Sequence, residues 1–325
     1  MSTELSNMPY RPCGDSGLKL SALGLGFWHS FGQPDDAREA RRLVEMALNL
    51  GVTHFDLANV YGPPVGEAER FFGQLLKDVI GARRDDLVIA TKAGHAMGEG
   101  AYQRGGSRKH LVAACEASLK RLGLDYVDLF YHHCPDPDTP LDETAEALAH
   151  LVWQGKALYI GLSKYPLEDA LRMKEMLGGL GAPCVVHQAR YNLMEVDYAA
   201  TMTDLNEAGV GSVIFSPLAQ GQLSARYLEG IPEDSRAGKA HGFLKKEALT
   251  PERLASIKQL NDFALSRGMS LPQLALAWLL HHEAVASVVL GASRVSQLVD
   301  NISVLQCPHF EMFDDAELAQ FIKEA

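Results

Sequence analysis

Three successive strand-like runs of the sequence end on residues that can carry chemistry. The first run, residues 53–61, places Asp56 among apolar residues and Tyr61 five positions later. The next two runs end on Lys92 and on His133. A buried strand tolerates a carboxylate only where a cation meets it, because an unpaired buried charge is costly. The pattern therefore indicates a site that combines a carboxylate, a phenol, an ammonium group and an imidazole.

These four groups together suit the reduction of a carbonyl compound. Lys92, held charged by Asp56, is expected to lower the pKa of the Tyr61 phenol from its ordinary value of about 10. A tyrosine tuned in this way can donate a proton to a carbonyl oxygen as that oxygen becomes an alkoxide. His133, neutral and donating through one ring nitrogen, would orient the carbonyl. Carbonyl reduction without a metal also needs a hydride donor, and the usual donor is a nicotinamide cofactor.

The same residues allow other interpretations. Asp56 and Lys92 would also suit a purely structural ion pair, since such pairs perturb pKa values too, and Tyr61 would suit a packing role. His132 and His133 alternate in direction on a strand, so at most one of them points into the site. A zinc site would draw on His54, Asp56, His132, His133 and Cys134. The alternation of neighbours along a strand and the charge of Lys92 both disfavour zinc, so we expect no metal.

The remainder of the chain alternates short apolar runs with amphipathic helices. From Leu23 onward there are roughly eight runs rich in β-branched residues, each followed by a helix. Strands that are apolar on both faces and joined by helices predict a parallel sheet. Eight such units in about 270 residues fit a closed (β/α)8 barrel (a TIM barrel), in which catalytic residues lie at the carboxyl ends of the strands. An open doubly wound sheet is the competing fold, but the run Ala22–Trp28 lacks the third glycine of a dinucleotide fingerprint.

The expected elements form one domain over residues 1–325, without a linker or a low-complexity stretch. A hairpin over residues 10–20 would cap one end of the barrel. We expect strands at residues 22–28, around Asp56, and at 87–92, 126–133, 157–162, 184–188, 211–215 and 287–290. We expect helices at residues 35–51, 66–77, 107–123, 141–153, 167–177, 198–208, 251–267, 271–282, 294–305 and 314–323. The long polar segment 219–250 has no strand pattern, and a loop of that length is usually functional.

Composition and charge narrow the classes of protein. Of the 325 residues, 47% are hydrophobic and 22% are charged, as in a globular protein that buries a substantial core. A formal net charge of −11 argues against nucleic acid as a partner, because phosphate binding needs a basic face. No apolar run reaches the roughly 18–20 residues that a membrane span requires. The five scattered cysteines form no C-x-x-C pair and no signal peptide is present, so we expect free thiols and a cytoplasmic location.

A series of short runs, taken together and in order, resembles the aldo-keto reductase superfamily from end to end. The runs are YR and GL of the predicted hairpin (10–11 and 17–18), LGLG (23–26), DLANVYG (56–62), PDPDTP followed by ET (135–140 and 143–144), GLS (161–163), FSPL (215–218) and GASR (291–294). Within the superfamily, the nearest resemblance is to the branch that holds the voltage-gated potassium channel beta subunits and the bacterial L-glyceraldehyde 3-phosphate reductases.

The resemblance implies a (β/α)8 barrel that binds NADP(H) in an extended form without a Rossmann motif. It also implies a catalytic tetrad of Asp56, Tyr61, Lys92 and His133. The channel beta subunits carry asparagine where His133 stands, so this histidine favours the reductases.

The resemblance further implies which residues hold the cofactor. Ser163 and Gln188 would hold the nicotinamide carboxamide, and Phe215 would stack on the nicotinamide in place of the tryptophan or tyrosine common elsewhere in the family. Trp28 and Asp56 would complete this end. The long segment would fold over the pyrophosphate, with contacts from Ser216, Pro217, Leu218, Gln220, Gly221, Leu223, Arg226, Ser235 and Arg236. The adenosine end would meet Gly291, Ser293, Arg294, Gln297, Asp300 and Asn301.

Two features of this cofactor site stay open. Arg226 and Arg236 would also suit a solvated loop surface. Arg294 suits a clamp for a 2′-phosphate by its charge and planarity. The family often has a basic residue where Gln297 stands, which leaves the preference for NADP over NAD open.

We therefore predict a metal-free, NADPH-dependent reductase of small aldehydes or ketones, with L-glyceraldehyde 3-phosphate or a methylglyoxal-like compound as examples. Because they lie in strand-end loops, the candidates for the substrate pocket are Trp28, Tyr61, His95, Tyr102 and Tyr165. The alternative is an NADP(H)-binding regulatory subunit that senses redox state with little turnover. The branch tends towards homo-oligomers, and we expect one here.

Overall fold

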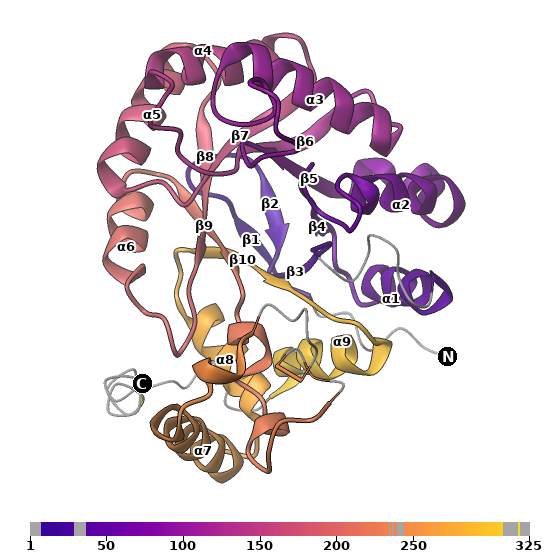
Figure 1. Cartoon of the computed structure of the whole chain (residues 1–325), viewed down its shortest axis with the longest axis vertical. Coiled ribbons are helices and arrows are strands. Elements are labelled where there is room, and N and C mark those ends of the chain that lie inside the picture. The colour runs from indigo at the N-terminus through magenta and orange to yellow at the C-terminus, as the bar shows by residue number, and fades with distance from the viewer. Residues whose placement is uncertain are drawn as a thin grey trace.

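Eight parallel strands close into a barrel in the computed structural model, which describes residues 8–28, 37–233, 235, 237–238, 244–307 and 318 (Figure 1). The strands run around the barrel in the order β10-β3-β4-β5-β6-β7-β8-β9. They are β3 (Leu23–Gly26), β4 (His54–Asp56), β5 (Val88–Ala93), β6 (Val127–His132), β7 (Ala157–Ser163), β8 (Cys184–Arg190), β9 (Gly211–Phe215) and β10 (Val285–Leu290). The predicted (β/α)8 barrel is therefore confirmed.

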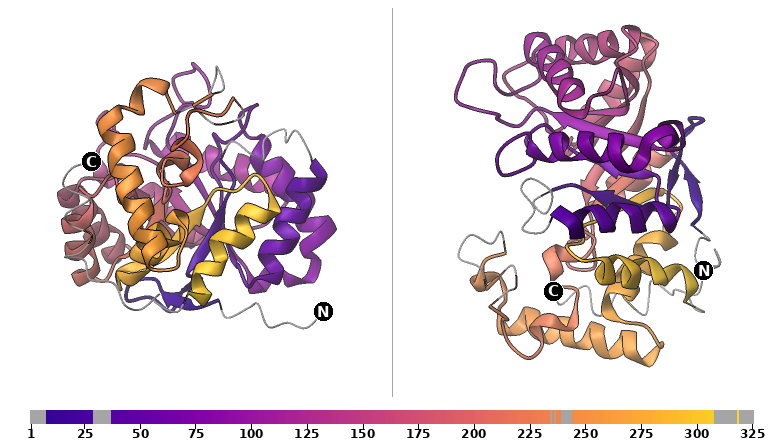
Figure 2. Two further views of the ribbon diagram at one scale, coloured as in Figure 1. Left: turned by 90° about the horizontal axis from the view of Figure 1, so that it is seen from below. Right: turned by 90° about the vertical axis from the view of Figure 1, so that its right-hand side faces the viewer.

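The helices connect successive strands and lie around the outside of the barrel (Figures 1 and 2). They are α1 (Ala37–Asn49), α2 (Glu67–Leu75), α3 (Arg108–Leu122), α4 (Leu141–Trp153), α5 (Leu167–Gly179), α6 (Ala199–Glu207), α7 (Pro251–Ser266), α8 (Leu271–His281) and α9 (Val295–Ile302). After α2 the chain continues as a π-helix, Leu76–Ile80, and a 3-10 helix, Gly81–Asp86. The prediction ended this helix at about residue 77, and the structure continues it through these two short helices.

Capping residues explain why both ends of α3 lie where the sequence predicted them. The Ser107 side chain accepts a hydrogen bond from the backbone N–H of His110 at 3.3 Å and begins α3. Gly123 ends the same helix with φ = 68°, a left-handed conformation that glycine adopts without steric cost. The predicted helix at residues 314–323 falls outside the described residues apart from Leu318, and the predicted start at Asp35 also lies outside them.

A two-stranded hairpin covers the amino end of the barrel, as predicted. Strands β1 (Tyr10–Pro12) and β2 (Lys19–Ser21) pair antiparallel. Cys13 directly follows β1, and Leu20 lies in β2. Both side chains belong to the buried cluster of the barrel interior, which also includes Val88 and Val185 near the starts of β5 and β8. In the right-hand view of Figure 2, this hairpin lies at the opposite end of the barrel from the long connecting loops. The far end, where the strands finish, is therefore the end available for a site.

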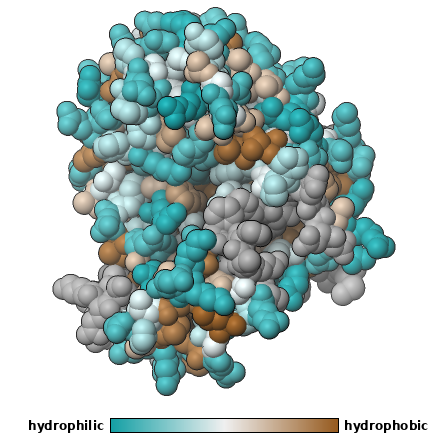
Figure 3. All heavy atoms as spheres, viewed as in Figure 1, coloured by the Kyte–Doolittle hydropathy of each residue, from teal (hydrophilic) through white to brown (hydrophobic). Residues whose placement is uncertain are grey.

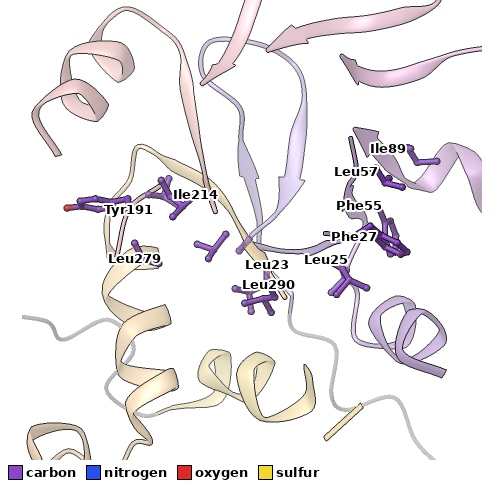
Figure 4. Packing of buried hydrophobic residues seen from close by; sticks show 14 of the residues in the cluster. Leu23, Leu25, Phe27, Phe55, Leu57, Ile89, Tyr191, Ile214, Leu279 and Leu290 are labelled. Atoms are coloured by element: carbon purple, nitrogen blue, oxygen red, sulfur yellow. The ribbon is translucent and has the colours of Figure 1, made fainter. Parts of the chain in front are cut away.

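Aromatic packing fixes the first strands against the first helices. The ring of Phe72 in α2 lies edge-on to Phe27, with 4.8 Å between ring centroids, and tilted against Phe55 of β4, with 5.3 Å between centroids. Phe27 and Phe55 are fully buried and belong to the large apolar cluster shown in Figure 4. Edge-to-face aromatic pairs add to the stabilisation that burial alone provides. This packing holds β4 so that Asp56, its last residue, reaches the mouth of the barrel.

The segment between β9 and α7 contains no strand among its described residues, as predicted. Its regular structure is limited to three short 3-10 turns, Ala219–Gly221, Ala225–Tyr227 and Lys246–Ala248. Hydrophilic side chains cover most of the molecular face drawn in Figure 3, and apolar side chains on it form scattered groups. Among the described residues, no helix is both long enough and apolar enough to cross a lipid bilayer.

A buried ion pair ties α2, α3 and β5 together on the outside of the barrel. Glu69 of α2 is fully buried, and its carboxylate accepts hydrogen bonds from Arg121 Nε at 2.6 Å and from Thr91 Oγ1 at 2.5 Å. Two residues earlier in the same helix, Glu67 forms an ion pair with Arg70 near the surface. Removing one partner of a buried pair leaves the other charge without compensation, whereas exposed pairs contribute little.

We therefore predict unequal effects of two matched substitutions in α2. Glu69→Ala should lower the free energy of unfolding by about 3 kcal/mol, because it strands the half-buried Arg121 and the Thr91 hydroxyl. Glu67→Ala, whose side chain is 26% exposed, should cost about 0.5 kcal/mol. Urea unfolding followed by circular dichroism measures both values, and equal losses for the two variants would contradict this account of α2.

Candidate active site

The carboxyl ends of neighbouring strands bring the four predicted catalytic residues together. Asp56 is the last residue of β4, Lys92 is the penultimate residue of β5, and His133 follows the last residue of β6. Tyr61 lies in the connection between β4 and α2. Because these strands are adjacent and parallel in the barrel, their ends converge on one side of its mouth.

A buried ion pair forms the centre of this group. Lys92 Nζ donates to Asp56 Oδ2 at 2.6 Å and to the backbone carbonyl oxygen of Leu57 at 2.7 Å. Gln188 Nε2 donates to the other carboxylate oxygen, Asp56 Oδ1, at 3.0 Å. Lys92 is fully buried, and burial lowers its pKa, while the charge of Asp56 and the hydrogen bond to it oppose that shift. The carboxylate therefore has a partner on both oxygens.

The pKa of Tyr61 moves in the direction opposite to the one predicted. Lys92 Nζ lies 5.2 Å from the centroid of the Tyr61 ring, close enough for a cation–π contact. Burial nevertheless raises the pKa of Tyr61 well above its ordinary value, and the negative charge of Asp56 raises it further. The expectation that Lys92 lowers this pKa is therefore wrong for the free protein, because burial of the phenol and the charge of Asp56 raise it. The phenol remains protonated and able to donate.

His133 is neutral and faces the same space. Its ring centroid lies 5.8 Å from that of Tyr61, with the two rings edge to face. Burial lowers the pKa of His133 well below its ordinary value, and the charge of Lys92 lowers it further. His132, in contrast, turns away and hydrogen-bonds through Nδ1 to the Tyr165 hydroxyl. The prediction that only one of the two histidines reaches the site is confirmed.

A cavity of about 830 Å³ opens over these residues, at the upper end of the size range of small-molecule and cofactor sites. Tyr61, Asp56 and His133 line it, and Lys92 lies behind Asp56. Most of the residues predicted to hold the cofactor also line it, namely Trp28, Ser163, Gln188, Phe215, Ser216, Pro217, Leu218, Gln220, Gly221, Arg226, Gly291, Ser293, Arg294, Gln297, Asp300 and Asn301. These residues come from separate segments of the chain, at the ends of β3, β7, β8, β9 and β10 and in the segments that follow β9 and β10, and the fold places them around one space.

Three buried polar atoms of the cavity wall have no hydrogen-bond partner among the residues that the structure describes. They are Ser163 Oγ, His133 Nδ1 and Gln220 Oε1. Buried polar atoms in native proteins almost always have a partner, so each unpaired atom calls for a group from outside the chain. A ligand with several hydrogen-bonding groups, such as a nicotinamide carboxamide near Ser163, fits this wall. The residues present therefore fit a nicotinamide cofactor.

Several predicted contacts lie elsewhere in the structure. Leu223 is fully buried in the main apolar cluster, and Ser235 is buried where its hydroxyl accepts from the Gly238 backbone N–H. Tyr102 is 59% exposed, and Tyr165 is buried against His132, so neither lines the cavity. These four residues are therefore not among those that line the described cavity, since a loop position in the sequence does not reveal which way a side chain turns. The cofactor contacts of Leu223 and Ser235 stay predictions. Arg236 lies outside the described residues.

The sequence did not indicate several residues of the cavity wall. His95 was predicted to lie there and does line the cavity. The cavity is also lined by residues that the sequence analysis did not name, among them Lys164, Arg190, Ser224, Tyr227 and Pro272. Arg190 follows Gln188 by two positions on β8, so the alternation of side chains along a strand could have revealed it. Lys164 follows the last residue of β7 with φ = 61°, a conformation that the sequence does not disclose.

No cluster of three or more histidine, cysteine, aspartate or glutamate side chains suited to a metal ion occurs within the described parts of the chain. Each of the five cysteines is a free thiol, as expected.

The barrel and the residues at its strand ends are those of an oxidoreductase, and the comparison with known proteins gives its family. Residues 22–321 match the model of the Aldo/keto reductase family, and the chain belongs to that family. Among its relatives are the L-glyceraldehyde 3-phosphate reductases of Escherichia coli O157:H7 and of Escherichia coli K12. Each is 48% identical to this chain over 323 residues, which cover 98% of this chain and 93% of the relative.

Proposed function

We propose that the protein is an NADPH-dependent reductase of small aldehydes, with L-glyceraldehyde 3-phosphate as the first substrate to test. The observation that carries the proposal is the arrangement of a protonated phenol and a neutral imidazole on one cavity wall, backed by a buried Lys–Asp pair. The names of the relatives support the class of substrate. We further propose that the protein is located in the cytoplasm. That it forms a homo-oligomer stays a prediction.

In the proposed mechanism, the substrate carbonyl oxygen lies between the Tyr61 hydroxyl and the His133 ring. Ser163, Gln188 and Phe215 would hold a nicotinamide cofactor, which when bound would supply a hydride for the carbonyl carbon. Tyr61 donates its proton to the oxygen as negative charge develops there. His133, which is neutral, can donate one N–H bond and hold the carbonyl in place. Lys92 provides the positive charge that stabilises the phenolate left behind, and Asp56 holds Lys92 in position.

The cofactor would lie along the cavity from Phe215 to the start of α9. Ser163 and Gln188 would hold the carboxamide, and the Phe215 ring would stack on the nicotinamide. At the other end, Gln297 Oε1 accepts from the backbone N–H and the hydroxyl of Ser293, at 3.0 and 3.1 Å. Arg294 lies between them and forms no ion pair with a carboxylate among the described residues. We propose that Arg294 binds the 2′-phosphate of NADPH.

The first prediction concerns the proton donor. Tyr61→Phe removes the phenol but keeps the ring, so kcat for aldehyde reduction should fall by at least about 10²-fold, the usual scale for losing a general acid. NADPH should still bind, as measured by quenching of protein fluorescence. Tyr102→Phe, at an exposed tyrosine away from the cavity, is the matched control and should keep wild-type turnover.

Two outcomes would decide against parts of this proposal. If Tyr61→Phe retained full activity, the assigned proton donor would be wrong. If the wild type bound NADPH and reduced none of a broad panel of aldehydes, the regulatory, redox-sensing alternative would replace the reductase.

The second prediction concerns the choice of cofactor. Arg294→Met should weaken NADPH binding by at least about tenfold, because charge-assisted hydrogen bonds to a phosphate are among the strongest in proteins. Binding of NADH, which lacks the 2′-phosphate, should change little. Arg42→Met, at a side chain that is 68% exposed on α1, is the control. If Arg294→Met weakened the binding of NADPH and of NADH by the same factor, Arg294 would not bind the 2′-phosphate.

A further inference from the structure

One wall of the cavity carries a row of contacts that leads away from the catalytic residues. The His95 ring lies beside the His133 ring, with 4.3 Å between centroids. Lys164 Nζ lies 3.1 Å from His95 Nε2 and 5.8 Å from the centroid of the Phe215 ring. Arg190 also approaches Phe215, with Cζ 5.8 Å from the ring centroid. A cation therefore stands next to the place proposed for the substrate, one histidine beyond His133.

Among the residues that the structure describes, no carboxylate forms an ion pair with Lys164. The two acidic residues on the cavity wall are Asp56, which is already bonded to Lys92 and Gln188, and Asp300 in α9. Arg190 differs from Lys164, because its guanidinium pairs with Glu195 at 3.1 Å. In a chain whose net charge is −11, this corner of the cavity is locally cationic.

The backbone is held in an unusual conformation at this lysine. Lys164 has φ = 61°, in the left-handed region that residues with a side chain rarely adopt. Its N–H donates to the carbonyl oxygen of Gln188 at 3.1 Å, which fixes the turn against β8. On a continuous strand, Ser163 and its successor would face opposite ways. The left-handed turn lets both residues line the cavity, and such strained residues cluster at functional sites.

The state of His95 fits a role in holding the lysine. Burial lowers the pKa of His95, and the charge of Lys164 lowers it further, so the imidazole is neutral near neutral pH. A neutral Nε2 can accept a hydrogen bond from the Lys164 ammonium group. His95 Nδ1 in turn lies 3.5 Å from Cys134 Sγ. One of the three ammonium hydrogens is used in this way, and the others remain for a ligand.

We propose that Lys164 binds an anionic group of the aldehyde substrate, a phosphate or a carboxylate. His95 positions the ammonium group, and Arg190 adds positive charge from the adjacent strand. This inference rests on the proposed reductase function and assigns to the same cavity a preference for anionic over neutral aldehydes.

The test compares matched substrates that differ in charge. Glyceraldehyde 3-phosphate is paired with glyceraldehyde, and succinic semialdehyde with butyraldehyde. For the wild type, kcat/KM should be higher for the anionic member of at least one pair. In Lys164→Met, the ratio of kcat/KM for that anionic member to its neutral partner should fall at least about tenfold, mainly through KM. Lys164→Arg should restore most of the ratio, and Lys120→Met, at an exposed lysine of α3, should leave it unchanged.

Each outcome decides the proposal, and the pair that responds identifies the anion as phosphate or carboxylate. The subsite is overturned if the wild type shows no preference for either anionic substrate, or if Lys164→Met reduces anionic and neutral substrates by the same factor. It is also overturned if Lys164→Met raises the Kd for NADPH in proportion to the loss of activity, since the lysine would then bind the cofactor. A wild type that reduces none of the four aldehydes would instead overturn the reductase function, and the subsite with it.

Discussion

The Asp56–Lys92 ion pair is the constraint on which the rest of the site depends. Two charges buried at the mouth of a barrel are costly unless each has close partners. Here the partners come from three places: Lys92 on β5, the Leu57 carbonyl oxygen after β4, and the Gln188 amide on β8. These contacts depend on the register of the parallel strands, in which Asp56 lies opposite Ala90 of β5, two residues before Lys92. The pair thus couples the register of the sheet to the position of the charge beside Tyr61.

The electrostatics of the cavity favour donation of a proton over its removal. Burial keeps the Tyr61 phenol protonated and the His133 imidazole neutral, so both present N–H or O–H donors to one region. Donors that are fixed in place before the reaction stabilise a developing alkoxide without reorganisation. Lys92 does not make the phenol acidic in the free protein. Its charge matters once the proton has left, when the phenolate and the Asp56 carboxylate would otherwise repel each other.

The sequence predicted the parts of the fold and site that follow from short-range pattern. Apolar runs that end on Asp56, Lys92 and His133 identified three strand ends correctly, because a charged or polar residue that ends a buried strand is rare without a reason. The sequence could not give the direction of the Tyr61 pKa shift, because burial depends on the packing of the whole barrel. Leu223 was assigned to the cofactor and lies in the core, since a loop pattern does not fix side-chain direction. The left-handed turn at Lys164 is set by β8, a strand that follows it in the chain.

The most direct test of the central claim follows the hydride itself. The wild-type protein is incubated with an aldehyde and with NADPH in which both hydrogens on C4 of the nicotinamide are replaced by deuterium. The alcohol product is then analysed by mass spectrometry. A reductase that uses this site should place one deuterium on the former carbonyl carbon of every product molecule. An alcohol without deuterium, or no alcohol from a protein that binds NADPH, would contradict the assignment of this barrel mouth to hydride transfer.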